Sequence, residues 1–572
     1  MAEYDLLIRG GTVIDGTGSA PKEADVGIVG GRIAAIGALS GGAEEIDAKG
    51  KLVTPGFVDI HTHYDAQAVW DSHLAPSSHH GVTTAVMGNC GVGFAPCKPA
   101  DRERLIELME GVEDIPGAVM HEGLKWEWES FAGYLDALER KRRDIDICAL
   151  LPHAAVRVFV MGDRAIALEN ANQADIAQMR QITREAMQAG AFGFSTSRSL
   201  SHKTLRGDPT PTLRAQEEEL RGIAMGMADA GSGMLEMVSE WMPDHNEEFA
   251  MLRRVVEACG RPAVFTLTQR HARPGVWRDL VAHADKAAAD GVPIRPVAAP
   301  RAIGVLLGLS GSQNPFSGCP TYKEIAHLPV AERARRMAEP AIRAAILSED
   351  PKKGSTFPLF HRLSFDYMFR FGNPPNYTPN KQDSISAIAA RQGRPAPEIA
   401  YDMLIENDGA NFIYMTLANY ASGDLSMSET LLDNPNVIMG LGDGGAHVAF
   451  ILDAGYQTWL LAHWGRERQR WSVPELVRRL TSDTAQAAGL HDRGVLAPGK
   501  KADVNVIDWD RLGADAPYVV SDLPAGGKRL MQAVHGYDAT IVSGAVTFRG
   551  GEATGSLPGR LVRGPQAERL AA

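Results

Sequence analysis

The first residues whose spacing suggests chemistry are His61 and His63, in the segment TPGFVDIHTHYD (54–65). An apolar run ends at this pair, and residues two apart in a strand point to the same side. Both imidazoles would then lie together at the C-terminal end of one strand, where two neutral imidazoles supply half of a zinc-type site. Because H-x-H also occurs by chance, two structural or surface histidines are the alternative.

A second candidate is Asp443 in GLGDGGAH (440–447), where the apolar strand NVIMGL ends beside several glycines. A carboxylate at a strand end, approached closely by other groups, suits a functional acid. It could bind a metal and also accept a proton from an attacking water. The alternative is a turn aspartate that caps the next helix, since Asp-Gly is common in turns.

The third candidate is Cys90 in MGNCGVG (87–93), which follows an apolar strand within a Gly/Asn turn. A thiolate is a good zinc ligand, and one sulfur can bridge two metal ions. A lone cysteine is more often a small buried apolar residue, and the sequence leaves both interpretations open.

The elements that would position these residues alternate between apolar strands and amphipathic helices, the pattern of a parallel sheet covered by helices. Helical patterns include 171–189, 215–230, 246–259 and 276–290. Eight strand–helix units favour an α/β fold of the (β/α)8 barrel type over an open sheet. The strands are expected at 52–63, 82–89, 146–153, 191–197, 233–240, 262–269, 292–299 and 436–443.

Both ends of the chain have short alternating apolar segments and Gly-containing turns, as in residues 4–37. We expect residues 1–54 and 490–572 to form one small β-sandwich domain, with two unrelated β extensions as the alternative. The barrel would span 55–489. Residues 300–435 are too long for an ordinary connection and contain Pro-rich turns and helical patterns at 329–347, 383–392 and 396–406. We interpret them as an insertion before the last barrel strand, either over the active-site face or packed peripherally.

The bulk composition excludes several classes of protein. The net charge of −12 argues against a nucleic-acid partner, which requires a basic surface. No apolar run reaches the roughly 18 residues of a membrane span, and the N-terminus lacks the pattern of a signal peptide. Five scattered cysteines without C-x-x-C suit a reducing, cytoplasmic location. The expected partner is a small-molecule substrate, and the sequence is also compatible with a homo-oligomer.

Together these motifs resemble the amidohydrolase superfamily, specifically its D-aminoacylase-like branch of N-acyl-D-amino-acid deacylases. The resemblance covers nearly the whole chain. It is carried by DLLIRGGTVIDGTG, PGFVDIHTHYDAQ, GNCGVGFAP, GAFGFSTS, DGGAH and GVLAPGKKADVNVID. It implies that His61 and His63 bind a divalent metal, Zn²⁺ as one or two ions, and that Asp443 binds metal and moves the proton. It also implies that Cys90 is a metal ligand.

The sequence departs from this branch on the fifth and sixth strands, each of which would end in a metal-binding histidine. Here these strands read GMLEMVSEWMP and AVFTLTQRH. Glu236 or Glu240 could supply oxygen ligands, and His271 lies just past the sixth strand. The tight metal site of the D-aminoacylases is therefore not expected in the same form.

Two residues after the fourth strand complete the candidate site. His202, in STSRSLSHKT, could add a ligand, although a polar loop histidine is the alternative. Arg198 could pair with a substrate carboxylate through its guanidinium fork, or it could be a structural or surface arginine. Lesser candidates are His447 and the pair His79-His80, which lies at the other end of a strand.

The sequence thus predicts a metal-dependent hydrolase that cleaves a non-peptide amide C–N bond, in an N-acyl (D-)amino acid or a similar acylated amine. Asp443 would act as general base and then as general acid. Because two strand histidines are missing, a different C–N, C–O or C–C cleavage is a second hypothesis. A non-catalytic scaffold is the third, and retention of His61, His63 and Asp443 together argues against it.

Overall fold

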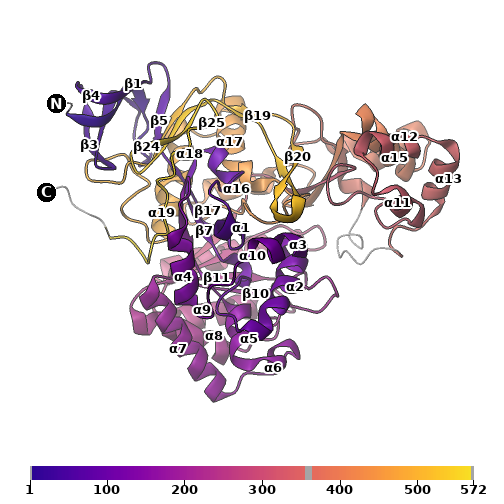
Figure 1. The fold of residues 1–572 in the computed structure, drawn as a ribbon, viewed down its shortest axis with the longest axis horizontal. Helices are drawn as coiled ribbons and strands as arrows, with labels where there is room; N and C mark the ends of the chain where they lie inside the picture. The colour runs from indigo at the N-terminus through magenta and orange to yellow at the C-terminus, as the bar shows by residue number, and fades with distance from the viewer. Residues whose placement is uncertain (1–2, 354–363, 568–572) are drawn as a thin grey trace.

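A computed structural model describes residues 3–353 and 364–567, and its central feature is a set of parallel strands (Figure 1). In one sheet β6 (Phe57–Asp59), β7 (Val82–Met87) and β8 (Asp146–Ala149) pair in that order. A second sheet runs through β9 (Leu151–Pro152), β10 (Gly193–Arg198), β11 (Met234–Ser239), β12 (Ala263–Thr266), β13 (Ile294–Ala298) and β17 (Ile438–Met439). Each of these strands overlaps one that the sequence predicts.

The two sheets are joined at both sides. Only Leu150 separates β8 from β9, and its N–H donates to Met87 O at 2.9 Å. On the other side His63 N donates to Gly444 O at 2.7 Å, which joins the segments that follow β6 and β17. The arrangement is therefore an α/β fold of TIM-barrel type.

Helices connect the parallel strands and pack around them. The amphipathic patterns predicted from sequence form α7 (Gln173–Ala189), α8 (Glu217–Ala230), α9 (His245–Cys259) and α10 (Val276–Ala289). Helix α7 begins with a capping box between Asn172 and Asp175 and ends at Gly190, whose left-handed backbone terminates it. Other helices are α1 (Gln67–Trp70), α2 (Arg102–Glu113), α3 (Gly117–Gly123), α4 (Phe131–Arg140), α5 (His153–Met161), α6 (Asp163–Ile166), α16 (Ser426–Asp433), α17 (Tyr456–Trp459), α18 (Val473–Leu480) and α19 (Ser482–Ala487).

The two ends of the chain form one nine-stranded sheet, drawn in indigo and yellow in Figure 1. N-terminal strands β1 (Tyr4–Val13), β2 (Lys22–Val29), β3 (Arg32–Gly37), β4 (Gly42–Asp47) and β5 (Leu52–Pro55) lie with β18 (Val504–Ile507), β23 (Tyr537–Val542), β24 (Ala545–Arg549) and β25 (Glu552–Ala553). The N-terminal and C-terminal strands meet where β18 pairs antiparallel with β5. Strands β1, β2 and β3 pair antiparallel, whereas β1 pairs in parallel with β4 and β5, so the sheet is mixed.

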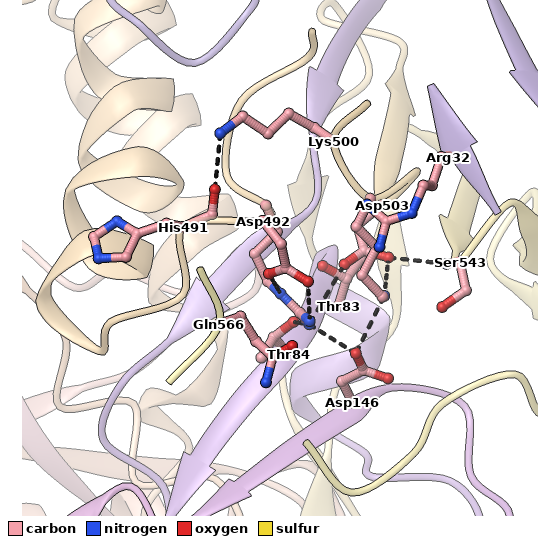
Figure 2. Close-up of polar contacts among 12 residues, drawn as sticks. Arg32, Thr83, Thr84, Asp146, His491, Asp492, Lys500, Asp503, Ser543 and Gln566 are labelled. Carbon is pink, nitrogen blue, oxygen red and sulfur yellow. Dashed lines mark hydrogen bonds and ion pairs between the residues drawn. The ribbon is translucent and has the colours of Figure 1, made fainter. Parts of the chain in front are cut away.

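A buried ionic cluster ties the parallel-strand unit to the segment that returns to this sheet (Figure 2). Asp146, the first residue of β8, accepts from Arg493 Nη1 at 2.7 Å and lies 3.2 Å from Lys501 Nζ. Asp503 pairs with both cations, and Asp492 pairs with Arg493. The last described residues continue along this side, since Ile147 N donates to the carbonyl of residue 560 at 3.0 Å. Residues 560–562 therefore contact the parallel strands as well.

Most of the described residues between 303 and 418 form a separate lobe at the right of Figure 1, whereas α16 packs with the parallel-strand unit. Its antiparallel sheet contains β14 (Ile303–Gly308), β15 (Met368–Arg370) and β16 (Phe412–Ala418), strands that the sequence analysis did not predict. Pro340 begins a new helix, so the single helix expected at 329–347 is divided. The helices are α11 (Pro320–Ile325), α12 (Val330–Met337), α13 (Pro340–Ser348), α14 (Ile385–Gln392) and α15 (Ala396–Ile405). An apolar core of its own includes Met337 and Tyr401.

A C-terminal hairpin reaches the segment that follows β17. Its strands are β20 (Tyr518–Leu523) and β21 (Gly527–Met531). Leu530 N donates to Val448 O at 2.6 Å, while Gly527 packs against Val119 of α3. Within residues 3–353 and 364–567, no helix combines the length and apolar character that crossing a membrane would demand.

Candidate metal and catalytic site

His61 and His63 follow β6, and backbone hydrogen bonds hold this segment extended. Thr62 N donates to Val86 O at 3.0 Å, and His63 N donates to Gly444 O at 2.7 Å. The two histidines are 3% and 1% exposed, and their ring centroids are 5.4 Å apart. The pair singled out by its spacing therefore lies together in the interior.

Asp443 faces both imidazoles. Its Oδ1 lies 3.5 Å from His61 Nε2 and 3.7 Å from His63 Nε2. Its own N–H donates to His61 O at 3.2 Å, so the segment that supplies the carboxylate also pairs with the histidine segment. The residues that follow form turns, and the next helical segment begins only at Asp453. The geometry thus gives Asp443 a place beside the histidines rather than at a helix cap.

Cys90 adds a sulfur donor. Its Sγ lies 3.5 Å from His61 Nε2. The next residue, Gly91, has a left-handed φ of +69°, and a Cβ there would lie only 2.8 Å from Thr196 Cα, so the turn requires glycine to approach β10. One donor atom from each of His61, His63 and Cys90 lies within 4.8 Å of the other two. Two imidazoles and a thiol at this separation fit a zinc-type ion.

Burial and mutual charge set the protonation of these groups. Burial lowers the pKa of His61 to about 4. Burial also acts to lower the pKa of His63, but the charges of Glu113 and Asp443 outweigh it and raise the pKa to about 9. Burial alone would raise the pKa of Asp443, but the contacts with both histidines outweigh burial and hold this pKa at about 2. The aspartate is therefore ionised at neutral pH and can accept a proton.

Two buried glutamates stand behind the histidines. Glu236 of β11 is 1% exposed and Glu113, the last residue of α2, is 2% exposed. Burial raises their pKa values to about 8 and about 7 respectively. Glu236 was an option from sequence, whereas Glu113 was missed. Nothing local distinguishes Glu113 from any glutamate at a helix end, because its importance depends on where α2 ends in space.

Three residues of the site have positive φ angles, a backbone conformation that residues other than glycine rarely adopt. Cys90 has φ of 56°, and Asp443 and His447 each have φ of 48°. Each such residue destabilises the folded state by roughly 1–3 kcal/mol, and the conformation persists only where contacts with surrounding residues hold it. Here Glu113 O accepts from His447 N at 2.5 Å. Their clustering supports a functional role for these two turns.

His202 lies next to the site without joining the three-donor cluster. Its Nδ1 is 2.8 Å from Ser197 Oγ. Burial lowers its pKa to about 3, and the charges of His63 and His447 add to that effect. His202 thus stays a candidate for a further ligand or a substrate contact.

Arg198 is held by protein groups. Its Nε donates to Glu248 Oε1 at 2.5 Å, its Nη2 to Glu248 Oε2 at 3.3 Å, and its Nη1 to Ala215 O at 2.5 Å. Every nitrogen of the guanidinium therefore already has a partner. This pairing favours the structural alternative over a substrate contact, which stays a prediction.

The remaining candidates also have partners away from the imidazole pair. Glu240 is paired with Arg270 and accepts from Ser199 Oγ at 2.7 Å. His271 Nε2 lies 2.8 Å from Thr416 O, and its ring stacks on Tyr367. His79 and His80 precede β7, and the His80 ring bonds Thr458 at 2.8 Å. None of these contacts reaches His61 or His63.

Comparison with known proteins identifies relatives along the whole chain. Residues 44–548 match the amidohydrolase family. An uncharacterized protein of Mycobacterium tuberculosis is 30% identical over 96% of this chain and 92% of its own length. The N-acyl-D-glutamate deacylase of Alcaligenes xylosoxydans xylosoxydans is 28% identical over 91% of both chains.

Solved structures show the same fold. The N-acyl-D-glutamate deacylase of Bordetella bronchiseptica, complexed with zinc and a phosphonate inhibitor, superposes with a TM-score of 0.64. It is 24% identical, with 98% of this chain and 99% of that chain covered. The predicted membership of the D-aminoacylase-like branch is confirmed, as is the prediction of a hydrolase that acts on non-peptide C–N bonds.

Proposed function

The chain belongs to the amidohydrolase family, and we propose that it hydrolyses the amide bond of an N-acyl-D-amino acid or a similar acylated amine with the help of a divalent metal, Zn²⁺, as one or two ions. The observation that carries the proposal is the convergence of His61, His63, Cys90 and Asp443 in the interior. Packing alone gives no reason to bury two imidazoles, a thiol and a carboxylate together.

His61, His63 and Cys90 would hold the ion, with Asp443 beside them and His202 as a further candidate. When bound, the ion supplies Lewis acidity, which polarises the amide carbonyl and makes water a better nucleophile. Asp443 is ionised at neutral pH, so its carboxylate accepts the proton of the attacking water. It then gives this proton to the leaving amine nitrogen.

The fold proposed for this activity is an eight-stranded (β/α)8 barrel in residues 55–489, interrupted by the 300–435 lobe. Residues 1–54 and 490–572 would form the β-sandwich domain. The pairing of β18 with β5 supports the joint domain, and the contacts of residues 560–562 with β8 argue for an earlier boundary at its end.

The decisive experiment combines metal analysis with turnover. Asp443→Asn should retain metal and lose about 10²–10⁴-fold in kcat on N-acyl-D-amino acids, the usual contribution of a general base. A His61→Asn/His63→Asn double variant should lose metal. His79→Asn, before the N-terminal end of β7, is the matched control and should change neither. A near-normal rate for Asp443→Asn would disprove the proposed proton transfer.

A second candidate function follows from one observation. Strand β11 contains no histidine and carries Glu236 at its third residue, so the metal environment differs from that of the resembled branch. Cleavage of another C–N, C–O or C–C bond is the alternative. A substrate panel with product masses distinguishes the two, because hydrolysis adds one water to the products and a lyase reaction adds none.

A further inference from the structure

The two candidate histidine ligands turn the same ring atom inward. His61 Nε2 lies 3.5 Å from both Asp443 Oδ1 and Cys90 Sγ. His63 Nε2 lies 3.7 Å from the same Asp443 oxygen. Because Nδ1 is the other nitrogen of each ring, it is left to face whatever stands behind the site.

A buried carboxylate stands behind each ring. Glu236 Oε1 lies 4.0 Å from His61 Nδ1, and Glu113 Oε1 lies 3.5 Å from His63 Nδ1. The second oxygen of each glutamate faces another part of the site. Glu236 Oε2 accepts from Cys90 N at 2.9 Å, and Glu113 Oε2 lies 3.6 Å from His447 Nε2. Glu236 Oε1 and His63 Nδ1 are buried without a hydrogen-bond partner among the described residues.

The geometry points to Glu236 and Glu113 as positioning residues that select Nε2 of His61 and His63 as the metal-binding atoms. A divalent ion bound at the site would favour the ionised form of the nearby glutamates and the neutral form of its ligand imidazoles. In that state each imidazole carries one proton, and each carboxylate can only accept. Each glutamate therefore fixes that proton on Nδ1 and leaves the Nε2 lone pair for the ion. The inference rests on the proposed metal site and deepens it.

Glutamine substitutions test this role without changing side-chain size. A glutamine has one acceptor oxygen where the glutamate uses two. In Glu236→Gln the Cys90 N–H keeps that oxygen, so the NH₂ group faces His61 Nδ1 and donates to it. This drives the imidazole proton onto Nε2, where it competes with metal. In Glu113→Gln the oxygen serves either His63 or His447, and the other contact is lost.

The experiment measures zinc affinity by competition with a chromophoric chelator, starting from metal-free protein. Glu236→Gln and Glu113→Gln should each bind zinc about 10–100-fold more weakly than wild type, the usual effect of losing an outer partner of a ligand histidine. Glu240→Gln is the matched control, because it makes the same change at the residue that follows the same strand but contacts Arg270 and Ser199. Its affinity should equal that of wild type. Absorption of the Co²⁺-loaded variants should show the wild-type number of ligands.

Each result has a distinct meaning. If wild type binds zinc and both glutamine variants bind it equally well, the positioning role is wrong and the metal site stands. A ligand missing from the Co²⁺ spectrum of Glu236→Gln would show direct coordination and would also overturn the inference. If wild type binds no metal, the proposed function itself fails.

A measurement on wild type covers the case in which a variant does not fold. In zinc-loaded protein with ¹⁵N-labelled histidine, the signals of His61 and His63 are assigned through His61→Asn and His63→Asn. Both rings should carry their proton on Nδ1. A proton on Nε2 of either ring overturns the assignment for its glutamate.

Discussion

Replacing Arg493 by methionine should destabilise the protein strongly while leaving the chemistry of the site intact. Arg493 is 1% exposed along its side chain and donates to Asp146 Oδ2 at 2.7 Å, to Thr84 at 2.9 Å and to Asp492 at 2.9 and 3.2 Å. Figure 2 shows Asp146, Asp492 and Asp503 gathered in this cluster. Without Arg493, Asp146 and Asp503 would keep only Lys501 as a paired cation, and Asp492 would lose its pair with Arg493.

The magnitude follows from this imbalance. Breaking a buried ion pair by removing one partner costs about 3–5 kcal/mol, because the other charge is left buried and unpaired. Asp146→Asn should cost less, about 1–3 kcal/mol, since its amide oxygen can still accept from Arg493. The double variant removes one cation and one anion together. Its loss should fall short of the sum of the single losses by about 1–3 kcal/mol.

The assay is urea unfolding followed by tryptophan fluorescence, with the midpoint converted to free energy at constant m. Arg253→Met is the matched control. Its partners Glu257 and Asp290 are exposed, so the loss should stay within about 1 kcal/mol. Zinc affinity should not change, because Asp146 begins β8 at the end opposite to His61. A loss below about 1 kcal/mol for Arg493→Met, or strict additivity in the double variant, would refute the reasoning.

The same cluster makes stability depend on acid pH. Burial acts to raise the pKa of Asp146, but Lys501 and Arg493 outweigh it and hold the pKa below its usual range. The unfolded chain then binds more protons than the folded chain once the pH falls below about 4, so stability decreases there. Because of this group, the free energy of unfolding of wild type should fall by up to about 1.4 kcal/mol per pH unit. The free energy of unfolding of Asp146→Asn should fall correspondingly less. Identical acid profiles for the two proteins would contradict this assignment.

Three further predictions concern the site. Gly111→Ala should lower stability by about 1–3 kcal/mol, because a Cβ would lie 2.2 Å from Lys203 O; urea midpoints check this, with Gly133→Ala as a neutral helical control. Arg198→Met should lower stability by about 3 kcal/mol, because buried Glu248 would lose its charged partner and keep only the hydrogen bond from Ser239, and a raised KM at unchanged stability would instead restore the substrate role of Arg198. Cys90→Ser should weaken zinc binding in the chelator competition while Cys97→Ser should not, and equal affinity in both would remove Cys90 from the ligand set.

The parts of the site that the sequence predicted lie at strand ends. The spacing of His61 and His63 fixes both on one side of an extended segment, whatever the rest of the chain does. Asp443 follows another parallel strand, and C-terminal ends of parallel strands meet at one face of such a fold. Local geometry together with strand order was therefore sufficient to bring these residues together.

Strand alternation also explains why the substrate role of Arg198 is not favoured. Ser195 and Ser197 of β10 face the site, where their hydroxyls contact Gly91 N at 3.1 Å and His202 Nδ1 at 2.8 Å. Arg198 lies one residue further and so points to the other side of the strand, where it meets Glu248 of α9. The alternation of side chains along β10 is therefore enough to separate Arg198 from the site.

Glu113 could not be found in this way. It lies 50 residues after His63 and at the end of a helix, so no periodicity connects it to a strand end.

The sheet of the 300–435 lobe was missed for a different reason. Its strands β14 and β16 are almost wholly buried apolar runs, which lack the alternation that identifies a half-buried strand.

The strained segment after β17 indicates why the site depends on distant parts of the chain. Asp443 and His447 hold left-handed backbone conformations that an isolated loop would leave, at roughly 1–3 kcal/mol each. Three separate elements restrain this segment: the carbonyl of Glu113 at the end of α2, the backbone of His63, and the hairpin strand β21 through Leu530 N to Val448 O. Since β21 belongs to the C-terminal part of the chain, that part stabilises the geometry around Asp443, although none of its described residues adds a side chain to the cluster of His61, His63 and Cys90. The conformation of the site is therefore set by the segment that bears both histidines and also by contacts that form only when the C-terminal part of the chain is folded.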